Sequence, residues 1–368
     1  DFITEVDTSP VSCLLAEIFR FFFGENLLRA RIFHALIQSL GIAGISWLAW
    51  RIFKPAMIPV LAVSILGVFS IPSIIFGQFG EMYAIFFAAA VIQYMVYWMV
   101  LRSDFSWSGY LIFAVSAYLC TLFEYLQVWI TLGLLLGSLL ERSKPRWRIR
   151  LVRALSAGIL YALLNSMPFF DLVARTGLKG GMRGYYLSYY PPALNDQSGI
   201  FAVFTYISYF ITRTYDLFNY HLSAVFNPAL YRPLHWNWVS LPFLAVLGGG
   251  AIIWLKKEKL NNQGIFAAFS GVLTVTLAAN FFFLLPYGGV RNLIIFAPLV
   301  WLIYGASVDR WNRLHLSRLF RISVRVILIG IPLLPFLLSL PGIYRARISR
   351  CDLDFIEKMI VKHRPDTL

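Results

Sequence analysis

The sequence predicts an all-α membrane protein, a polytopic bundle of about ten transmembrane helices with interfacial helices in the first and the long extracytoplasmic loops. Its 368 residues are 59% hydrophobic and 14% charged, and their mean hydropathy is +0.70, which is far too apolar for a soluble chain of this length. Apolar runs near the bilayer-spanning length recur along almost the whole chain. Aromatic residues make up 17% of it, which fits the belts at the two membrane interfaces.

The formal charge of +14 fits membrane topology better than nucleic-acid binding. Lys and Arg residues fall in short clusters between apolar runs and do not form one basic face, so we expect no nucleic-acid partner. The three cysteines, Cys13, Cys120 and Cys351, lie far apart without metal or redox spacing. We therefore predict that all three are unpaired.

Residues 1–30 are predicted to form the first extracytoplasmic loop. Within it, residues 11–23 carry apolar side chains at helical spacing, and Gly24 follows as a stop signal. A helix of about 13 residues is too short to span a bilayer, so we expect it to lie in the interface. The chain begins at Asp1 and ends, over residues 342–368, in what reads as the start of an extracytoplasmic segment. It is expected to be a fragment that lacks a first span.

Residues 31–341 are predicted to form the transmembrane domain. Two spans are expected to meet at Glu124 almost without a loop, because the apolar run around it is twice too long for one crossing. Glycines, tyrosines and a Pro-Pro pair interrupt the pattern over 171–236, which predicts a long extracytoplasmic loop with an aromatic amphipathic stretch at 201–226. The expected spans cover residues 32–53, 56–76, 82–101, 107–123, 125–140, 151–170, 237–255, 264–285, 292–307 and 324–341.

Orientation follows from the short basic connections, because Lys and Arg are retained on the cytoplasmic side. Those at 51–54, 102, 141–150, 256–259 and 310–325 alternate with the others, so all five are predicted to be cytoplasmic. The opposite side then holds the first loop, the turn at 78–81, Glu124, the long loop, the turn at 287–291 and the C-terminal tail. The uneven loops argue against a transporter built from inverted halves.

Polar side chains suited to group transfer converge on the predicted extracytoplasmic side. A carboxylate there can deprotonate an acceptor hydroxyl, while arginines stabilise the charge that develops on a leaving phosphate. The planar guanidinium grips phosphate oxygens in pairs, which lysine cannot do. The candidate acids are Asp7, Glu5, Glu81, Glu124 and Asp171, and the candidate phosphate ligands are Arg175, Lys179, Arg183 and Arg291.

Most of these residues have a simpler interpretation. Asp7 precedes Pro10 and is well placed to cap a helix. Glu81 fits a helix start, and Glu124 fits a solvated turn. Arg291 can snorkel to lipid headgroups. The cations at 175, 179 and 183 can be ordinary loop charges.

Two kinds of cofactor chemistry have no support in the sequence. Two of the five histidines, His34 and His315, lie in or beside apolar or basic stretches, and no pair of histidines has ligand spacing, so we expect no metal. The chain lacks a phosphate-cradling Gly-Lys-Ser/Thr loop and a Gly-x-Gly-x-x-Gly turn, so we expect no nucleotide cofactor.

Several short stretches resemble the C-type (GT-C) membrane glycosyltransferases, closest in style to the protein O-mannosyltransferase and lipid A aminoarabinose transferase branch. Residues Asp7 to Pro10, a helix, and Phe23 to Arg29 are similar to the family's first extracytoplasmic loop. Phe76 to Tyr83 looks like its Ser-Gln-x-x-Arg-x-Tyr turn, and Arg291 to Pro298 is similar to its late Arg-Tyr-Leu-x-Pro stretch. The tail at 351–368 resembles the start of the extracytoplasmic region that many members append.

The resemblance implies an inverting transferase that moves a sugar from a polyprenyl-phosphate donor to a protein, lipid or glycan acceptor, with no cofactor. The implied setting is a prokaryotic plasma membrane with the site on its extracytoplasmic face. Asp7 or Glu5 would be the base or would position the acceptor. The residues implied in binding the substrate or its phosphate are Arg291, Arg183, Arg175, Lys179, Glu124, Glu81, Gln78 and Tyr83.

Two other functions stay open. A transporter or flippase for an anionic lipid-linked substrate would also use arginines on the outer face. A catalytically inactive paralogue is the third interpretation, because the chain departs from the family pattern. It has Ser9 in place of His, Val11 in place of the second Pro, Glu81 where Arg is usual, and Asn292 in place of Tyr.

Overall fold

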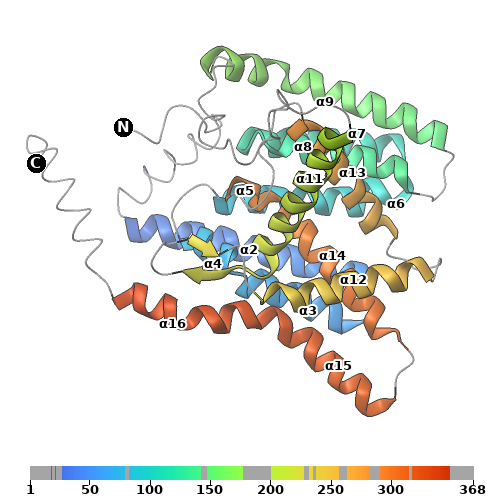
Figure 1. The fold of residues 1–368 in the computed structure, drawn as a ribbon. Helices are drawn as coiled ribbons and strands as arrows, with labels where there is room; N and C mark the ends of the chain where they lie inside the picture. The colour runs from blue at the N-terminus through green and yellow to red at the C-terminus, as the bar shows by residue number, and fades with distance from the viewer. Residues whose placement is uncertain are drawn as a thin grey trace, which may run out of the picture.

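The described part of the chain is a bundle of α-helices with one two-stranded hairpin (Figure 1). Helix α9 runs along one edge of the bundle, α15 and α16 run along the opposite edge, and α11 crosses the front obliquely. The computed structural model describes residues 18, 21, 27–78, 83–141, 147–176, 200–227, 232–234, 238–256, 263–281, 291–314 and 317–348.

The first half of the chain forms a succession of helices joined by short connections. Helix α5 continues through a π-helical turn, η1, into the short α6, so that residues 83–104 are helical without a break. Ser106 caps the next helix by accepting a hydrogen bond from the Gly109 N–H at 3.0 Å. The elements are α2 (Leu27–Phe53), α3 (Met57–Phe69), α4 (Ile71–Gln78), α5 (Tyr83–Val96), η1 (Tyr97–Leu101), α6 (Arg102–Asp104), α7 (Trp107–Phe123), α8 (Gln127–Leu140) and α9 (Trp147–Thr176).

The second half opens with a helix inside the predicted long loop. Residues 200–222 form α11, which confirms that the amphipathic stretch is helical. Strands β1 and β2 then pair antiparallel, with Val225 opposite Leu234. The elements are α11 (Ile200–Leu222), β1 (Val225–Asn227), β2 (Arg232–Leu234), α12 (Ser240–Lys256), α13 (Gln263–Phe281), η3 (Arg291–Phe296), α14 (Ala297–Asn312), α15 (Arg318–Gly330), η4 (Ile331–Leu333) and α16 (Leu334–Ile348).

The structure supports a membrane-embedded helical protein, but not the full count of ten spans. Six stretches of described helix are long and apolar enough to cross a bilayer: 31–53, 83–104, 147–166, 264–281, 294–312 and 318–342. The apolar helices at 57–69, 107–123, 127–140 and 240–252 are shorter than a full crossing.

The predicted span at 56–76 is wrong as a single helix. The chain leaves helical geometry at Ser70, whose ψ of 135° is extended, and α4 starts one residue later. Pro72 explains the break, because proline has no N–H to donate to the preceding turn and its ring clashes with it. The last predicted span, 324–341, starts earlier than expected and is interrupted by the 3-10 turn η4 at Pro332.

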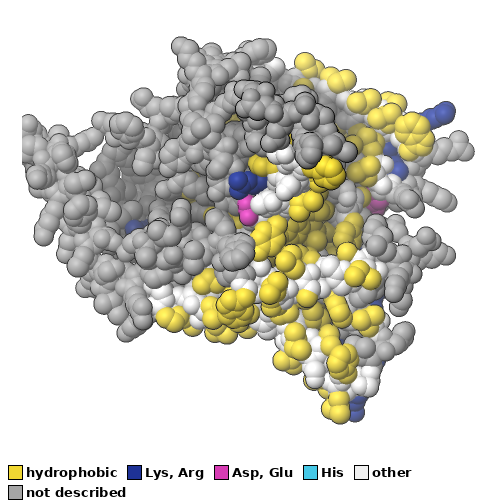
Figure 2. All heavy atoms as spheres, in the orientation of Figure 1, with side chains coloured by type: hydrophobic (Ala, Val, Ile, Leu, Met, Phe, Trp, Pro, Cys, Tyr) yellow, Lys and Arg dark blue, Asp and Glu magenta, His cyan; other side chains and the backbone are white. Residues whose placement is uncertain are grey.

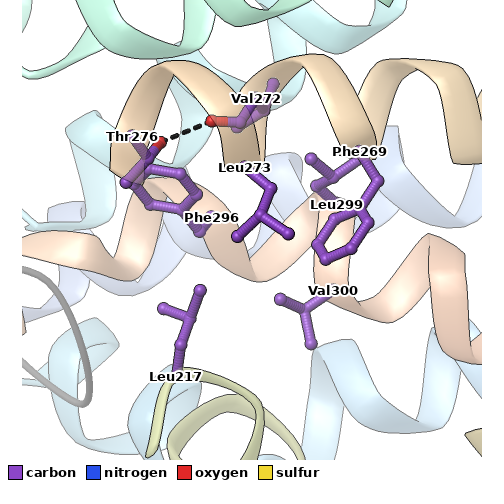
Figure 3. Close-up of a pocket in the computed structure, with 8 residues that line it drawn as sticks. All are labelled: Leu217, Phe269, Val272, Leu273, Thr276, Phe296, Leu299 and Val300. Atoms are coloured by element: carbon purple, nitrogen blue, oxygen red, sulfur yellow. Dashed lines mark hydrogen bonds between the residues drawn. The ribbon is translucent and has the colours of Figure 1, made fainter. Parts of the chain in front are cut away.

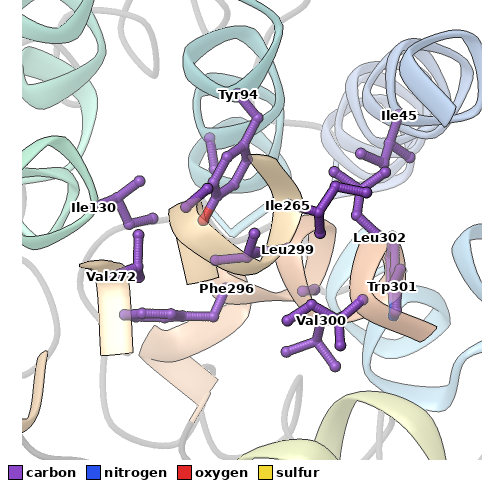
Figure 4. Close-up of a cluster of buried hydrophobic side chains, with 14 of the residues drawn as sticks. Ile45, Tyr94, Ile130, Ile265, Val272, Phe296, Leu299, Val300, Trp301 and Leu302 are labelled. Atoms are coloured by element: carbon purple, nitrogen blue, oxygen red, sulfur yellow. The ribbon is translucent and has the colours of Figure 1, made fainter. Parts of the chain in front are cut away.

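Helix α14 is the centre of the bundle. It packs against α2, α3, α5, α11, α12, α13 and α15. Every residue from Ala297 to Arg310 is buried. Trp301 is fully buried in it and donates its indole N–H to the His221 carbonyl of α11 at 3.1 Å. In Figure 4, Ile45, Tyr94 and Ile265 approach the α14 residues from three other helices. A helix this buried contacts protein on all sides instead of lipid.

Helices α8 and α13 make the closest contact in the bundle, through glycines. A β-carbon on Gly133 would lie 2.4 Å from the Val272 α-carbon, and one on Gly271 would lie 2.2 Å from the Gly133 carbonyl oxygen. Gly137 similarly faces Ala268. The glycines Gly133 and Gly137 form a Gly-x-x-x-Gly pattern, which lets helix backbones approach closely in membranes.

Charged side chains join α6, α8 and α9 at one end of the bundle. Arg102 forms a salt bridge with Glu141, which is 5% exposed, and lies over the Trp98 ring. Arg150 donates to the Ser138 carbonyl at 2.7 Å, and Arg153 donates to the Phe105 carbonyl at 2.5 Å. Gly264, at the start of α13, contacts the Arg102 guanidinium. The basic connections at 102 and 141–150 therefore meet at one end, as their shared orientation predicts.

The predicted basic connection at 310–325 is largely helical. Helix α14 extends to Asn312, so that Arg310 is 1% exposed and stacks on Phe266 at 5.0 Å. Asp309 and Arg313 stabilise this last turn as an ion pair at 2.9 Å, one helical turn apart. Helix α15 starts only a few residues later, at Arg318.

Candidate functional site at the opposite end of the bundle

The candidate residues that the structure describes lie at the end opposite the Arg102–Glu141 pair. Tyr83 begins α5 and is buried against Phe86, with the two rings edge to face. Glu124 precedes α8, whose first residue, Gln127, donates its side-chain amide to the Phe86 carbonyl at 3.1 Å. The starts of α5 and α8 are therefore side by side.

Glu124 is a buried turn residue. It follows the last residue of α7, is 9% exposed, and accepts a hydrogen bond from the Leu126 N–H at 3.2 Å. The predicted tight connection between two helices at this position is confirmed. The interpretation of Glu124 as a solvated turn residue does not fit, because its side chain is buried between the end of α7 and the start of α8.

Gln78 and Arg291 are described by their backbones. Gln78 is the last residue of α4, and Arg291 is the first residue of η3. Elements α4, α5 and η3 contact one another, and the Tyr94 hydroxyl of α5 reaches the Ile295 carbonyl of η3 at 3.5 Å. The segments that carry Gln78, Tyr83 and Arg291 are therefore neighbours.

The remaining candidates are described by their backbones alone or lie outside the described residues. Arg175 lies near the C-terminal end of α9, where only the backbone is described. The other predicted site residues lie outside the described residues: Asp7, Glu5, Glu81, Lys179 and Arg183. Asp171 is described by its backbone in α9. The roles predicted for Asp7 as base and for Arg291 as phosphate ligand thus stay predictions.

Buried polar side chains inside the bundle were not singled out from the sequence. Gln38 of α2 donates to the Ser73 hydroxyl of α4 at 2.8 Å. Gln93 of α5 donates to Thr131 of α8, and Gln93, Gln127 and Thr131 are all fully buried. They are uncharged polar residues within apolar runs, and this was the signal that could have found them, because such residues in membrane helices face the bundle interior.

A second polar contact holds α11 over this end. The Tyr209 hydroxyl donates to the Asn280 side-chain oxygen at 3.2 Å, which ties α11 to the last turn of α13. Further along α11, Arg213 and Asp216 form an ion pair at 2.8 Å. Figure 2 shows a basic and an acidic group in contact near the middle of this face, bordered by hydrophobic side chains.

An apolar cavity lies beneath α11. In Figure 3, Leu217 of α11 and Phe269 of α13 face Phe296 and Val300 across it, and Thr276 turns its hydroxyl back to the Val272 carbonyl. The cavity holds about 10 Å³, which is the room of about one water molecule, and its lining is apolar. It is a packing space between four elements, α11, α13, η3 and α14, and it is far too small for a sugar or a lipid.

A hydrogen bond between α7 and α9 positions the chain just before Glu124. The hydroxyls of Thr121 and Tyr161 are 2.6 Å apart, and Thr121 also donates to the Ala117 carbonyl at 2.9 Å. Tyr161 must therefore be the donor between the two hydroxyls. The pair is buried, so no water competes with it.

Replacing Tyr161 with phenylalanine is expected to lower the free energy of unfolding by about 1 kcal/mol, the usual net value of one buried hydrogen bond. Denaturant unfolding of the protein in mild detergent measures this change. Tyr118→Phe is the control, at a half-buried position on α7. Equal losses in both variants would mean that the Thr121–Tyr161 contact has no specific role.

Among the described residues, no group of three or more His, Cys, Asp or Glu side chains is close enough together to hold a metal ion. Comparison of the chain with protein-family models, with curated proteins and with solved structures finds no match. The functional conclusion therefore depends on the site and on the motifs in the sequence.

Proposed function

We propose that this protein is a polytopic membrane glycosyltransferase that moves a sugar from a polyprenyl-phosphate donor to an acceptor outside the cytoplasm. The observation that carries the proposal is that the segments ending at Gln78 and starting at Tyr83 and Arg291 are neighbours, and that Glu124 lies beside the start of α5. These are the segments whose motifs resemble the GT-C family. The proposed setting is a prokaryotic plasma membrane with the site on its extracytoplasmic face.

In the proposed reaction, Asp7 or Glu5 accepts the proton of the acceptor hydroxyl. The acceptor oxygen then attacks the anomeric carbon from the face opposite the phosphate, and the bond from that carbon to the phosphate oxygen breaks. The polyprenyl phosphate leaves with the bonding electrons, so the product has inverted configuration. Arg291, Arg183 and Arg175 stabilise the developing negative charge. The remaining proposed substrate contacts are Lys179, Gln78, Glu81, Tyr83 and Glu124.

The test is transfer of a radiolabelled sugar from polyprenyl phosphate by the full chain in nanodiscs. Asp7→Asn and Arg291→Ala are each expected to lower the rate by at least about a hundredfold, because removal of a general base or of a charge-stabilising group has effects of this size. Arg148→Gln, an exposed change near the start of α9, is the control and should transfer normally. Normal transfer by both site variants would overturn these assignments.

A transporter or flippase for the same class of lipid is the second candidate, and discontinuous helices favour it. The chain leaves helical geometry at Ser70, between α3 and α4, and a 3-10 turn separates α15 from α16. Broken helices of this kind line substrate sites in transporters. Movement of a labelled donor across vesicles without an acceptor supports the transporter, sugar transfer supports the enzyme, and donor binding with neither outcome indicates an inactive paralogue.

A further inference from the structure

The helix break at Ser70 changes the hydrogen bonding of the backbone around it. Helix α3 ends at residue 69, and α4 begins at residue 71. Pro72 has no N–H, so the Val68 carbonyl lacks the donor that a continuous helix would supply. The Gly67 carbonyl accepts a hydrogen bond from the Ser73 hydroxyl at 2.8 Å. The C-terminal end of α3, which carries a partial negative charge, points into this break.

A glutamine of the neighbouring helix α2 is fixed at the break. The Gln38 side-chain amide donates to the Ser73 hydroxyl at 2.8 Å, while that hydroxyl gives its own proton to the Gly67 carbonyl. Because a carbonyl can only accept, the direction of both hydrogen bonds is determined. Gln38 must therefore use its NH₂ group here, and its oxygen Oε1 is left over. Helices α2, α3 and α4 pack against one another around this contact (Figure 1).

Two buried side-chain oxygens at the break have no hydrogen-bond partner in the described chain. They are Gln38 Oε1 and the Ser70 hydroxyl oxygen, on residues that are each 4% exposed. Gly67, Ile71 and Ser73 are buried as well, so the break is closed to bulk water. A buried acceptor without a partner destabilises a fold, and Oε1 can be satisfied only by a donor or by a cation.

We propose that the break between α3 and α4 binds a sodium ion. Its ligands are Gln38 Oε1, the Ser70 hydroxyl oxygen and the Val68 carbonyl oxygen. Unwound carbonyls and the C-terminal ends of half-helices coordinate sodium in this way where membrane helices are discontinuous. Helices α2, α3 and α4 contain no acidic residue, so the site lacks the carboxylate that a divalent ion such as calcium prefers. The site stands whichever of the two proposed functions holds.

The experiment measures binding of radioactive sodium to the full chain in detergent by scintillation proximity, with choline chloride keeping the ionic strength constant. The unmodified chain is expected to bind sodium saturably. Ser70→Ala and Gln38→Leu each remove a ligand and should weaken binding about tenfold or more, since even groups beside a metal ligand have effects of this size.

Thermal unfolding gives a second readout of the same site. Replacing choline with sodium at equal concentration is expected to raise the unfolding midpoint of the unmodified chain by about 3 °C, because an ion that binds only the folded state stabilises it. The midpoint of Ser70→Ala should shift by less than about 1 °C. A water molecule alone at the break would give no sodium-dependent shift, and that result would overturn the proposal.

Two matched variants control for the loss of a polar side chain. Ser64→Ala removes a hydroxyl of α3 that bonds to the Val60 carbonyl of its own helix at 2.9 Å. Gln93→Leu removes another fully buried glutamine, which donates to Thr131 of α8. Both should bind sodium within about threefold of the unmodified chain, because neither group is a ligand. Ser70→Ala keeps the test valid if Gln38→Leu does not fold. Equal weakening in the controls and in Ser70→Ala would contradict the proposed site.

Discussion

Replacing Gly271 with leucine is expected to lower the free energy of unfolding by about 3 kcal/mol or more. Even a β-carbon at this position would lie 2.2 Å from the Gly133 carbonyl oxygen and 2.4 Å from the Gly137 backbone nitrogen. These are backbone atoms and cannot rotate away, so α8 and α13 must separate along their whole contact. Overpacking of a rigid interface has costs of this size, and the better helix propensity of leucine recovers less than about 1 kcal/mol.

Gly248→Leu on α12 is the matched control for Gly271→Leu, because a β-carbon there has open space around it. It should leave the free energy of unfolding unchanged or raise it slightly. Denaturant unfolding in mild detergent, followed by far-ultraviolet circular dichroism, compares the two variants directly. If both behave alike, the close approach of α8 and α13 is not what holds this part of the bundle together.

Removing the Arg102 side chain as Arg102→Ala is expected to lower the free energy of unfolding by about 3 kcal/mol. The Arg102 Nε donates to both Glu141 oxygens, at 2.9 and 3.0 Å, and Glu141 is 5% exposed. Without the guanidinium, the Glu141 carboxylate stays buried with no cation beside it. An uncompensated buried charge lowers the free energy of unfolding strongly. The substitution also removes the contact of Arg102 with the Trp98 ring.

Two comparisons isolate the role of the Arg102–Glu141 pair. The double variant Arg102→Met/Glu141→Met should be more stable than Arg102→Ala, since it leaves no unpaired charge. Arg213→Ala breaks the partly exposed pair with Asp216 and should lower stability by less than about 1 kcal/mol. A loss in Arg102→Ala no larger than that in Arg213→Ala would show that burial of Glu141 is unimportant.

The lengths of the apolar runs predicted the helices well, because the thickness of the bilayer requires about 20 apolar residues in a spanning helix. The expected spans at 107–123 and 125–140 coincide with α7 and α8. Run length could not predict that the chain would leave helical geometry at Ser70, before Pro72, and divide the span at 56–76. It also could not distinguish α14, which is buried by protein, from the exposed helix α9, because their apolar stretches have the same mean hydropathy of 1.2.

Only part of the candidate site could be predicted from the sequence. The prediction considered charged residues in loops and left out uncharged polar residues inside the spans. Glu124 and the segments of Tyr83 and Arg291 lie at one end of the bundle, and this follows from the alternation of basic connections. Gln93, Thr131 and the other buried polar residues escaped notice. Their partners come from different helices, and the pairing depends on packing that no single apolar run encodes.

The contact of α8 with α13 also determines when this part of the bundle can assemble during synthesis. About 120 residues separate the end of α8 from the start of α13. A ribosome therefore needs roughly ten seconds between the synthesis of α8 and that of α13. During that interval the face of α8 that carries Gly133 and Gly137 can contact other helices in the membrane. A chaperone of the insertion machinery that shields this face would raise the yield of correctly assembled protein.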